Sequence, residues 1–318
     1  MPKFKIRHLT KYSYEIPVRD SANQIMLYPI EDLHQDKLSH TITITGNPAI
    51  DTHHDYFGNE IGTFTHSMPH SELIIDSRLL IETTPKALPQ DIAPVAEQWK
   101  ELRSIRSQVP YIDFLRQEKI ARQSELEKII GDEQKKNHSP LESARFFCTY
   151  VFENFKYKKG ITTVESTLDE VWELKSGVCQ DFAHILLIML RQISIPARYV
   201  SGYICPNKTT MRGEGATHAW VEAYIPFYGW LGLDPTNNCI ANENHVRLAV
   251  GKNFSDCSPV KGTYRGTSEH TLEVGVTVAY EDGHVREDFG EPVTHEPVIS
   301  SSKNSYRRHL EMQMQQQQ

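Results

Sequence analysis

The segment that decides the fold places a cysteine in front of a long apolar helix; residues 176–193 read SGVCQDFAHILLIMLRQI. From residue 180 to 193, apolar side chains surround nearly the whole helix, which predicts a core helix that ends before Pro196. At a helix N-terminus, free backbone N–H groups and the helix dipole favour an anion, and the thiolate is the nucleophilic form of cysteine. We therefore interpret Cys179 as a candidate nucleophile; the alternative is a buried cysteine that packs as a small apolar side chain.

Two predicted strands further along the chain carry a histidine and an aspartate. The first reads THAWVEAY from residue 217, so that His218 stands at its beginning. The second reads GWLGLDPT from residue 229, and Asp234 stands at its end, where Pro235 stops the ladder. Taken singly, His218 has an ordinary polar interpretation, and an aspartate before a proline also suits an Asx turn.

These two strands are predicted to form a hairpin. Counting across a four-residue loop, 226–229, pairs residue 221 with 230 and brings 217–218 opposite 233–234. The carboxylate of Asp234 would then lie beside the imidazole of His218, where it can hold one tautomer and stabilise the imidazolium. Three moderate signals thus predict one site that contains a thiol, an imidazole and a carboxylate.

Size and composition exclude several classes of function. The 318 residues suggest two domains, and 39% hydrophobic with 24% charged residues is ordinary for a globular protein. A net charge of -7 argues against nucleic acid or an anionic membrane as partner, and no run approaches the roughly 20 apolar residues of a membrane helix. The basic N-terminus lacks a secretory pattern, and five widely spaced cysteines form no zinc or redox motif. We expect a reduced, cytoplasmic setting, with a mature exported protein whose leader has been removed as the alternative; the oligomeric state stays open.

Residues 1–88 are predicted to be a β-rich domain, because apolar residues alternate with polar ones and Gly, Asn and Pro signals separate the runs. The expected strands lie at 4–14, 24–28, 39–45, 59–66 and 73–83. Residues 89–138 are predicted to be a linker with helical segments. The catalytic core is expected at 139–290, and no cofactor is expected in it. The glutamine-rich tail, 291–318, is expected to be disordered.

Within the predicted core, Ser139-Pro140-Leu141-Glu142 has the pattern of a capping box with proline in the first turn, so a helix should begin there. The expected core strands lie at 197–204, 218–225, 230–233, 264–265, 271–280 and 284–289. Asp282-Gly283 predicts a tight hairpin between the last two.

Four segments together resemble the transglutaminase core superfamily, and most closely its bacterial cysteine-protease branch, in which a β-rich N-terminal domain precedes the core. They are SGVCQDFAH at 176–184, IPARYVSGY at 195–203, THAWVE at 217–222 and GWLGLDPTN at 229–237. The resemblance covers about residues 1–290 and implies an α+β, papain-like core, with the cysteine helix packed on an antiparallel sheet. It implies Cys179 as nucleophile, His218 as general base and acid, and Asp234 as orienting carboxylate. Where relatives often carry glycine, this chain has Ser194.

The resemblance also implies acyl transfer from an amide of a peptide or protein substrate through a thioester, with no cofactor. Water as acceptor gives proteolysis or amide hydrolysis, whereas an amine gives protein crosslinking. An aromatic side chain upstream of the cysteine is the family's second oxyanion donor, which makes Tyr157 a candidate; core packing is its alternative. The amide of Gln180 is the other candidate.

Two further side chains near Cys179 are assigned other roles. Asp181 lies in the first turn, so it is interpreted as structural or as facing substrate. His184 lies about 140° around the helix from Cys179, which predicts a buried hydrogen-bonding role.

Two other classes of function compete with the thiol enzyme. A zinc site built from Cys179, His218, Asp234 and His184 uses acceptable ligands, but no close ligand pair exists in the sequence, so no metal is expected. A non-catalytic binding module that kept the fold is the other alternative. The presence of all three triad residue types argues against it.

Overall fold

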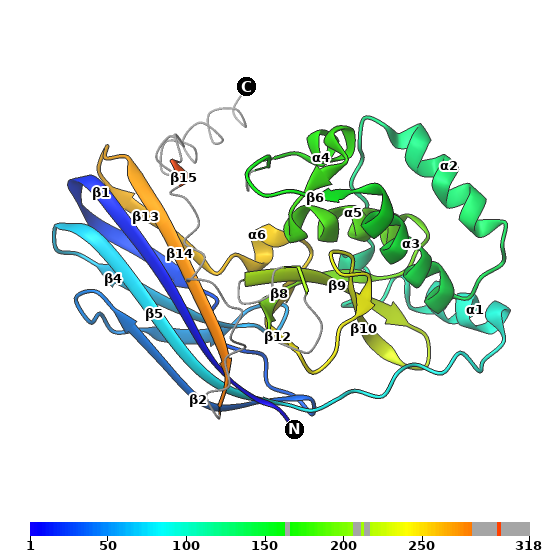
Figure 1. The fold of residues 1–318 in the computed structure, drawn as a ribbon, viewed down its shortest axis with the longest axis horizontal. Coiled ribbons are helices and arrows are strands. Elements are labelled where there is room, and N and C mark those ends of the chain that lie inside the picture. Colours follow the sequence, from blue (N-terminus) through cyan, green and yellow to red (C-terminus); the bar gives the residue numbers. More distant parts are fainter. Residues whose placement is uncertain (163–165, 206–210, 213–216, 282–297, 300–318) are drawn as a thin grey trace. The chain divides into compact units, whose positions relative to one another are not determined.

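A computed structural model describes residues 1–162, 166–205, 211–212, 217–281 and 298–299. The chain forms two compact units, Met1–Thr84 with Ser258–Gln318, and Pro85–Cys257 (Figure 1). Each has its own sheet, and the second also contains the long helices, so the predicted α+β fold is confirmed. None of the described helices is long and apolar enough to cross a bilayer.

The first unit is an antiparallel sheet arranged around one long strand, β1 (Lys3–Ile25). Buried and exposed residues alternate along its first half, where Phe4, Ile6, His8 and Thr10 point inward. Pairing directly with β1 are β4 (Glu60–His66), β5 (His70–Thr83), β13 (Val260–Arg265) and β14 (His270–Tyr280). The outer strands are β2 (Gln35–Ile44), which pairs with β5, β3 (Asp51–His54), which pairs with β4, and β15 (Val298–Ile299), which pairs with β14.

The predicted extent of the core, 139–290, is wrong at its C-terminal end. Strands β13 and β14 belong to the first unit, and β14 pairs with β1 from Phe4–Tyr280 to Tyr14–His270. The physical reason is that β1 offers a long alternating strand to which the alternation of β14 matches in register. The turn at 282–283, the strand at 284–289 and nearly all of the tail, 291–318, lie outside the described residues.

The second unit packs helices on a five-stranded antiparallel sheet of order β11-β10-β9-β8-β12. These strands are β8 (Ala197–Ile204), β9 (Thr217–Ile225), β10 (Gly229–Asp234), β11 (Cys239–Ile240) and β12 (His245–Gly251). The helices are α1 (Val95–Ile105), a 3-10 turn η1 (Asp113–Leu115), α2 (Gln123–Gln134), α3 (Pro140–Asn154), α4 (Leu168–Leu174), α5 (Cys179–Gln192) and α6 (Phe254–Cys257). Two short strands, β6 (Lys156–Tyr157) and β7 (Ser176–Gly177), pair in parallel.

The segment predicted as a separate linker, 89–138, is part of this second unit. Its helix α1 contacts α3, and α2 contacts the central helix α5. Their inward side chains explain this, because Leu102 on α1 and Leu126 on α2 are almost fully buried. The segment therefore adds to the core rather than spacing two domains.

Helix α5 is the centre of the second unit. It packs against β8 and β9 on one side and against α3 on another. Apolar residues face every direction around it, and the buried ones are Phe182, Ala183, Ile185, Leu186, Leu187, Ile188, Met189 and Leu190. It ends because Ser194 adopts a left-handed conformation, φ +65°, and the N–H of Ile195 bonds back to the carbonyl of Leu190 at 3.0 Å.

Candidate active site

His218 and Asp234 come from neighbouring strands, and His218 Nε2 lies 2.9 Å from Asp234 Oδ2. Both side chains are 0% exposed, so water does not compete for this bond. The predicted juxtaposition is therefore present. How it arises differs from the prediction, because the register of the hairpin is not the one that simple counting gave.

The observed register pairs Trp230 with Tyr224 and Leu233 with Val221, so the predicted pairing of residues 221 and 230 is wrong. The loop has three residues, 226–228, rather than four, because Phe227 takes a left-handed conformation and Gly229, at φ +99°, already pairs with Ile225. One step beyond the last pair, Asp234 comes level with Trp220. His218 shares the face of Trp220 and lies diagonally across from the carboxylate.

Asp234 is held as an anion by donors on both oxygens. Oδ1 accepts from the backbone N–H groups of Thr236 at 2.9 Å and Asn237 at 3.3 Å. Oδ2 accepts from His218, from Asn237 Nδ2 at 2.7 Å and from His245 Nε2 at 3.4 Å. Burial alone would raise the pKa of Asp234, but the charge and hydrogen bond of His218, with His245, hold it well below the usual range.

This bonding pattern also selects the tautomer of His218. An ionised carboxylate only accepts, so Nε2 of His218 carries the proton and Nδ1 has the lone pair unless the ring is charged. Nδ1 is buried and has no hydrogen-bond partner among the described residues. Burial lowers the pKa of His218, but Asp234 and then Cys179 outweigh it, and the pKa of the imidazole lies above its ordinary value.

Cys179 is the first residue of α5 and is half-buried. The turn before it is fixed by Asp181, whose Oδ2 accepts from the N–H of Val178 at 2.8 Å and from the hydroxyl of Thr162 at 2.7 Å. A Cβ on Gly177 would lie 2.4 Å from that oxygen, so only glycine allows this approach. Of the two roles predicted for Asp181, the structure shows the structural one.

The two oxyanion candidates lie on either side of this turn. Tyr157 pairs with Gly177 in the β6–β7 ladder, and its ring meets Phe182 edge-on at 6.3 Å. Burial, then the interaction with Cys179, raises the pKa of Tyr157 to about 12, so its hydroxyl keeps its proton and can donate at neutral pH. Gln180, the other candidate, is the second residue of α5 and is half-buried.

The zinc ligand set considered from the sequence is not assembled. His184 points elsewhere on α5, where its Nε2 accepts from the N–H of Phe254 at 3.1 Å and its ring packs 5.3 Å from Tyr199. Burial lowers the pKa of His184 to about 4, which keeps it a neutral acceptor. The predicted hydrogen-bonding role of His184 is confirmed.

Trp220 forms a wall behind His218, with the two rings stacked at 25° and 6.1 Å. It is 0% exposed, and it fits because two neighbouring strands carry glycine at the contact. A Cβ on Gly202 would lie 2.7 Å from the indole, and one on Gly232 would lie 3.5 Å from its Nε1. Trp220 is therefore a core residue.

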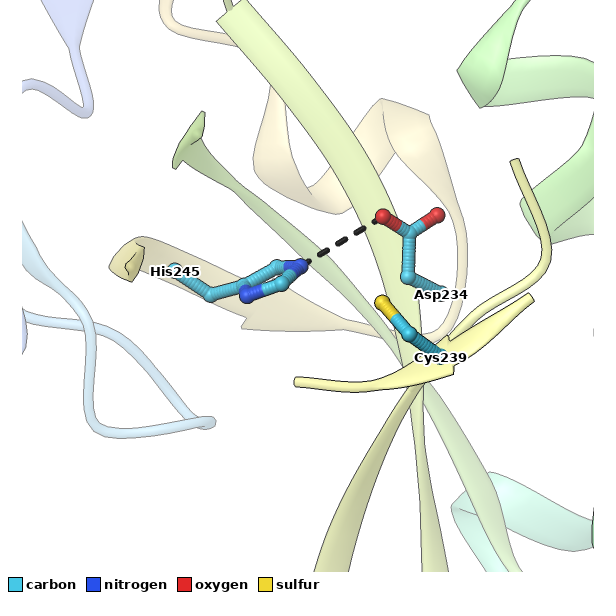
Figure 2. Close-up of side chains that lie close together, drawn as sticks. All are labelled: Asp234, Cys239 and His245. Atoms are coloured by element: carbon cyan, nitrogen blue, oxygen red, sulfur yellow. Dashed lines mark hydrogen bonds and ion pairs between the residues drawn. The ribbon is translucent and has the colours of Figure 1, made fainter. Parts of the chain in front are cut away.

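Sequence reasoning missed three residues beside Asp234. Asn237 lies in the recognised segment 229–237, and its amide was the available signal. Cys239 and His245 had none, because they follow the last motif and reach Asp234 only through the strand order (Figure 2).

Known proteins resemble both parts of the chain. Residues 4–82 match the bacterial transglutaminase-like N-terminal region, and residues 128–235, which include Cys179, His218 and Asp234, match the transglutaminase-like superfamily. An uncharacterized protein of Mycobacterium leprae is 31% identical over 282 residues, which are 87% of this chain and 99% of that protein. The chain belongs to the transglutaminase-like superfamily.

Two further proteins resemble this chain, one in structure and one in sequence. A solved structure from Cytophaga hutchinsonii, called a "Putative Cysteine Protease", superposes with a TM-score of 0.72 at 20% identity and covers 91% of this chain and 94% of that one. This likeness shows the fold. A protein-glutamine gamma-glutamyltransferase of Pseudomonas aeruginosa is 30% identical over 118 residues, which are 34% of this chain and 18% of that protein.

Proposed function

We propose that the protein is a thiol-dependent hydrolase or acyltransferase that acts on amide bonds of peptides or proteins through a thioester. The observation that carries the proposal is the buried bond from His218 Nε2 to Asp234 Oδ2, which leaves Nδ1 without a partner among the described residues. A ring held in this way can exchange a proton with a thiol, and Cys179 is the thiol that influences its protonation. Membership of the superfamily supports the same assignment.

The reaction follows from these roles. His218 takes the thiol proton of Cys179, the sulfur attacks the carbonyl carbon of the amide, a C–S bond forms, and the negative charge moves to the carbonyl oxygen. The C–N bond then breaks while His218 gives its proton to the leaving amine, which leaves a thioester. Water or an amine attacks this thioester while His218 accepts its proton, and the C–S bond breaks as His218 returns that proton to the sulfur, which restores the thiol.

The anionic oxygen of the intermediate needs donors close to Cys179. The N–H of Cys179 belongs to the first turn of α5, where helix N–H groups have no helical partner. The Tyr157 hydroxyl is protonated at neutral pH and is placed beside this turn by its pairing with Gly177. We assign these two as the oxyanion donors, with the Gln180 amide as the alternative to Tyr157.

A test must separate hydrolysis from amine transfer. The protein is incubated with a peptide library that contains glutamine, with and without a fluorescent primary amine, and products are read by mass spectrometry. Cleaved or deamidated peptides indicate a hydrolase; peptides that carry the amine indicate a transglutaminase. Both products must disappear with Cys179→Ala and persist with Cys257→Ala, a buried thiol elsewhere in the unit. Products that survive Cys179→Ala contradict the proposal.

A further inference from the structure

A second group of reactive side chains lies behind the His218–Asp234 pair. Asp234, Cys239 and His245 each point one ligand atom to a common centre, and these atoms lie within 4.8 Å of one another (Figure 2). They come from the end of β10, the start of β11 and the start of β12. Asp234 and Cys239 are direct cross-strand partners, which explains why the carboxylate and the sulfur meet.

The three ligand types suit a thiophilic divalent cation. Zinc binds thiolate sulfur, imidazole nitrogen and carboxylate oxygen, and three protein ligands leave a fourth position for water. Calcium and magnesium favour all-oxygen sites and fit this group less well. A dication with one thiolate, one carboxylate and one neutral imidazole has no net charge, so a buried site can hold it without an uncompensated ion.

His245 is already oriented for such a role. Its Nδ1 lies 3.2 Å from both the side-chain oxygen and the N–H of Asn242, and its backbone N–H bonds to the Asn242 carbonyl at 2.9 Å. When Nε2 binds a metal, the proton moves to Nδ1, the hydrogen bond that Nδ1 accepts from the Asn242 N–H is given up, and the amide oxygen of Asn242 accepts the proton instead. A carbonyl behind the ligating histidine is the usual support at metal sites.

The site shares an oxygen with the proposed catalytic pair. Asp234 Oδ2 accepts from His218 at 2.9 Å and faces His245 Nε2 at 3.4 Å, so a cation between His245 and Cys239 would draw on the same lone pairs. We propose that Asp234, Cys239 and His245 form a binding site for a zinc-class cation, and that its occupation inhibits the enzyme by taking Asp234 from His218. Binding releases one proton, from the thiol of Cys239, and moves the single proton of His245 from Nε2 to Nδ1. The inhibitory half rests on the proposed function, whereas the binding half does not.

Binding is tested in metal-stripped full-length Cys179→Ala protein, so that the nucleophile cannot act as a ligand. Titration with Co²⁺ should give a thiolate-to-cobalt band in the near ultraviolet that saturates at one equivalent and disappears when Zn²⁺ is added. The band should be lost in Cys179→Ala/Cys239→Ser and weakened in Cys179→Ala/His245→Gln. It should persist in Cys179→Ala/Cys257→Ala. No thiolate band, or a band that survives Cys239→Ser in a folded variant, overturns the site.

Inhibition is tested by the rate at which iodoacetamide alkylates Cys179, compared with and without one equivalent of Zn²⁺. Each variant is referred to its own metal-free rate. Zinc should slow alkylation at least about tenfold with Cys239 present, since loss of the aligning carboxylate costs a triad about 10⁴ in kcat. Zinc should not slow the alkylation of Cys179 in the Cys239→Ser variant. If zinc slows alkylation equally with Cys239 and in Cys239→Ser, the metal binds at Cys179 itself, and the inhibitory half of the proposal is overturned. A slow metal-free rate with an intact cobalt band would instead contradict the proposed function.

Discussion

The surroundings of His218 have opposing effects on the pKa of its imidazole. Full burial favours the neutral ring, whereas Asp234 and Cys179 favour the charged one and prevail, so its pKa is raised. Asp234 changes in the opposite sense, and its pKa is lowered by the same bond. Both shifts describe one coupled pair, so their contributions to stability are not added together.

This pairing predicts how stability depends on pH. A histidine whose pKa is raised in the folded state stabilises fully below its unfolded pKa, about 6.5, and loses that contribution as pH rises through the folded value. The free energy of unfolding should therefore fall with rising pH above about 6.5. Urea unfolding at a series of pH values checks this in wild type and His218→Gln. The fall should be smaller in the variant; equal slopes would show that His218 does not gain a proton affinity on folding.

At the scale of elements, the two ends of α5 are built differently. Its start depends on the Asp181 oxygen that folds back to Val178, and this approach needs the missing side chain of Gly177. Its end depends on Ser194 in a left-handed conformation that glycine adopts more easily. We therefore expect the start to position the Cys179 sulfur and the end to affect stability alone.

Gly177→Ala should displace the turn that begins α5. The added Cβ meets Asp181 Oδ2 at 2.4 Å, so the loop must shift, at a cost of about 1–3 kcal/mol in unfolding free energy. Alkylation of Cys179 should slow as well. The control is Gly131→Ala in α2, where a Cβ meets nothing within 4 Å, and stability should rise by about 0.5–1 kcal/mol. Two variants with equal stability and equal reactivity would refute the role of Gly177.

Ser194→Gly should stabilise the C-terminal end of α5. The left-handed conformation costs a side-chain-bearing residue about 1–2 kcal/mol, and the greater freedom of unfolded glycine returns about 0.5–1 kcal/mol of that. The net expectation is a gain of about 0.5–1 kcal/mol in urea unfolding, with Cys179 reactivity unchanged. Ser194→Ala, which keeps a Cβ, should give no gain; a loss of stability in the glycine variant would argue against the strain.

At the scale of the whole molecule, the sheet of the first unit is made from both ends of the chain. Strand β1 is paired along most of its length by β14 and β5, and its last residues pair with β13 and β4. The second unit, Pro85–Cys257, is inserted between these strands in the sequence.

That arrangement predicts the effect of truncation. A chain that ends at Cys257 lacks β13 and β14 but keeps β5, so those amides of residues 4–14 that face β14 should lose protection in hydrogen exchange. A chain that ends at Glu281 keeps both strands and should retain the protection. If both truncated chains protect residues 4–14 equally, the pairing of β1 with β14 is not what holds this sheet.

Local sequence patterns predicted many of the helices and strands, whereas most of the wrong predictions concern which strands pair over long range. The capping box at Ser139 forms as expected, with the Ser139 N–H to Glu142 at 2.9 Å, and the strand predicted at 197–204 is β8. The expected strand 4–14 and the first two residues of the expected strand 24–28 instead belong to one strand, β1, because irregular pairing near Asp20, at φ +50°, bends that strand without ending it. No local pattern shows which strand β14 will join.

The candidate site divides in the same way. Cys179, His218 and Asp234 stand in segments with recognisable local chemistry, so the sequence alone proposes them as site residues. Cys239 meets Asp234 because β11 pairs with β10, and His245, at the start of β12, reaches the same carboxylate although β12 pairs with β8 at the other edge of the sheet. Strand order of this kind depends on tertiary packing, which the local sequence does not encode.

The central claim is that a buried carboxylate aligns an imidazole that activates the thiol of Cys179. The most direct measurement is the rate of iodoacetamide alkylation of each of the five cysteines, resolved by peptide mass spectrometry in wild type and His218→Gln. We predict that Cys179 reacts fastest in wild type and slows markedly in the variant, while the other four keep their rates. Uniformly slow labelling of all five, or a Cys179 rate that His218→Gln leaves unchanged, would contradict the claim.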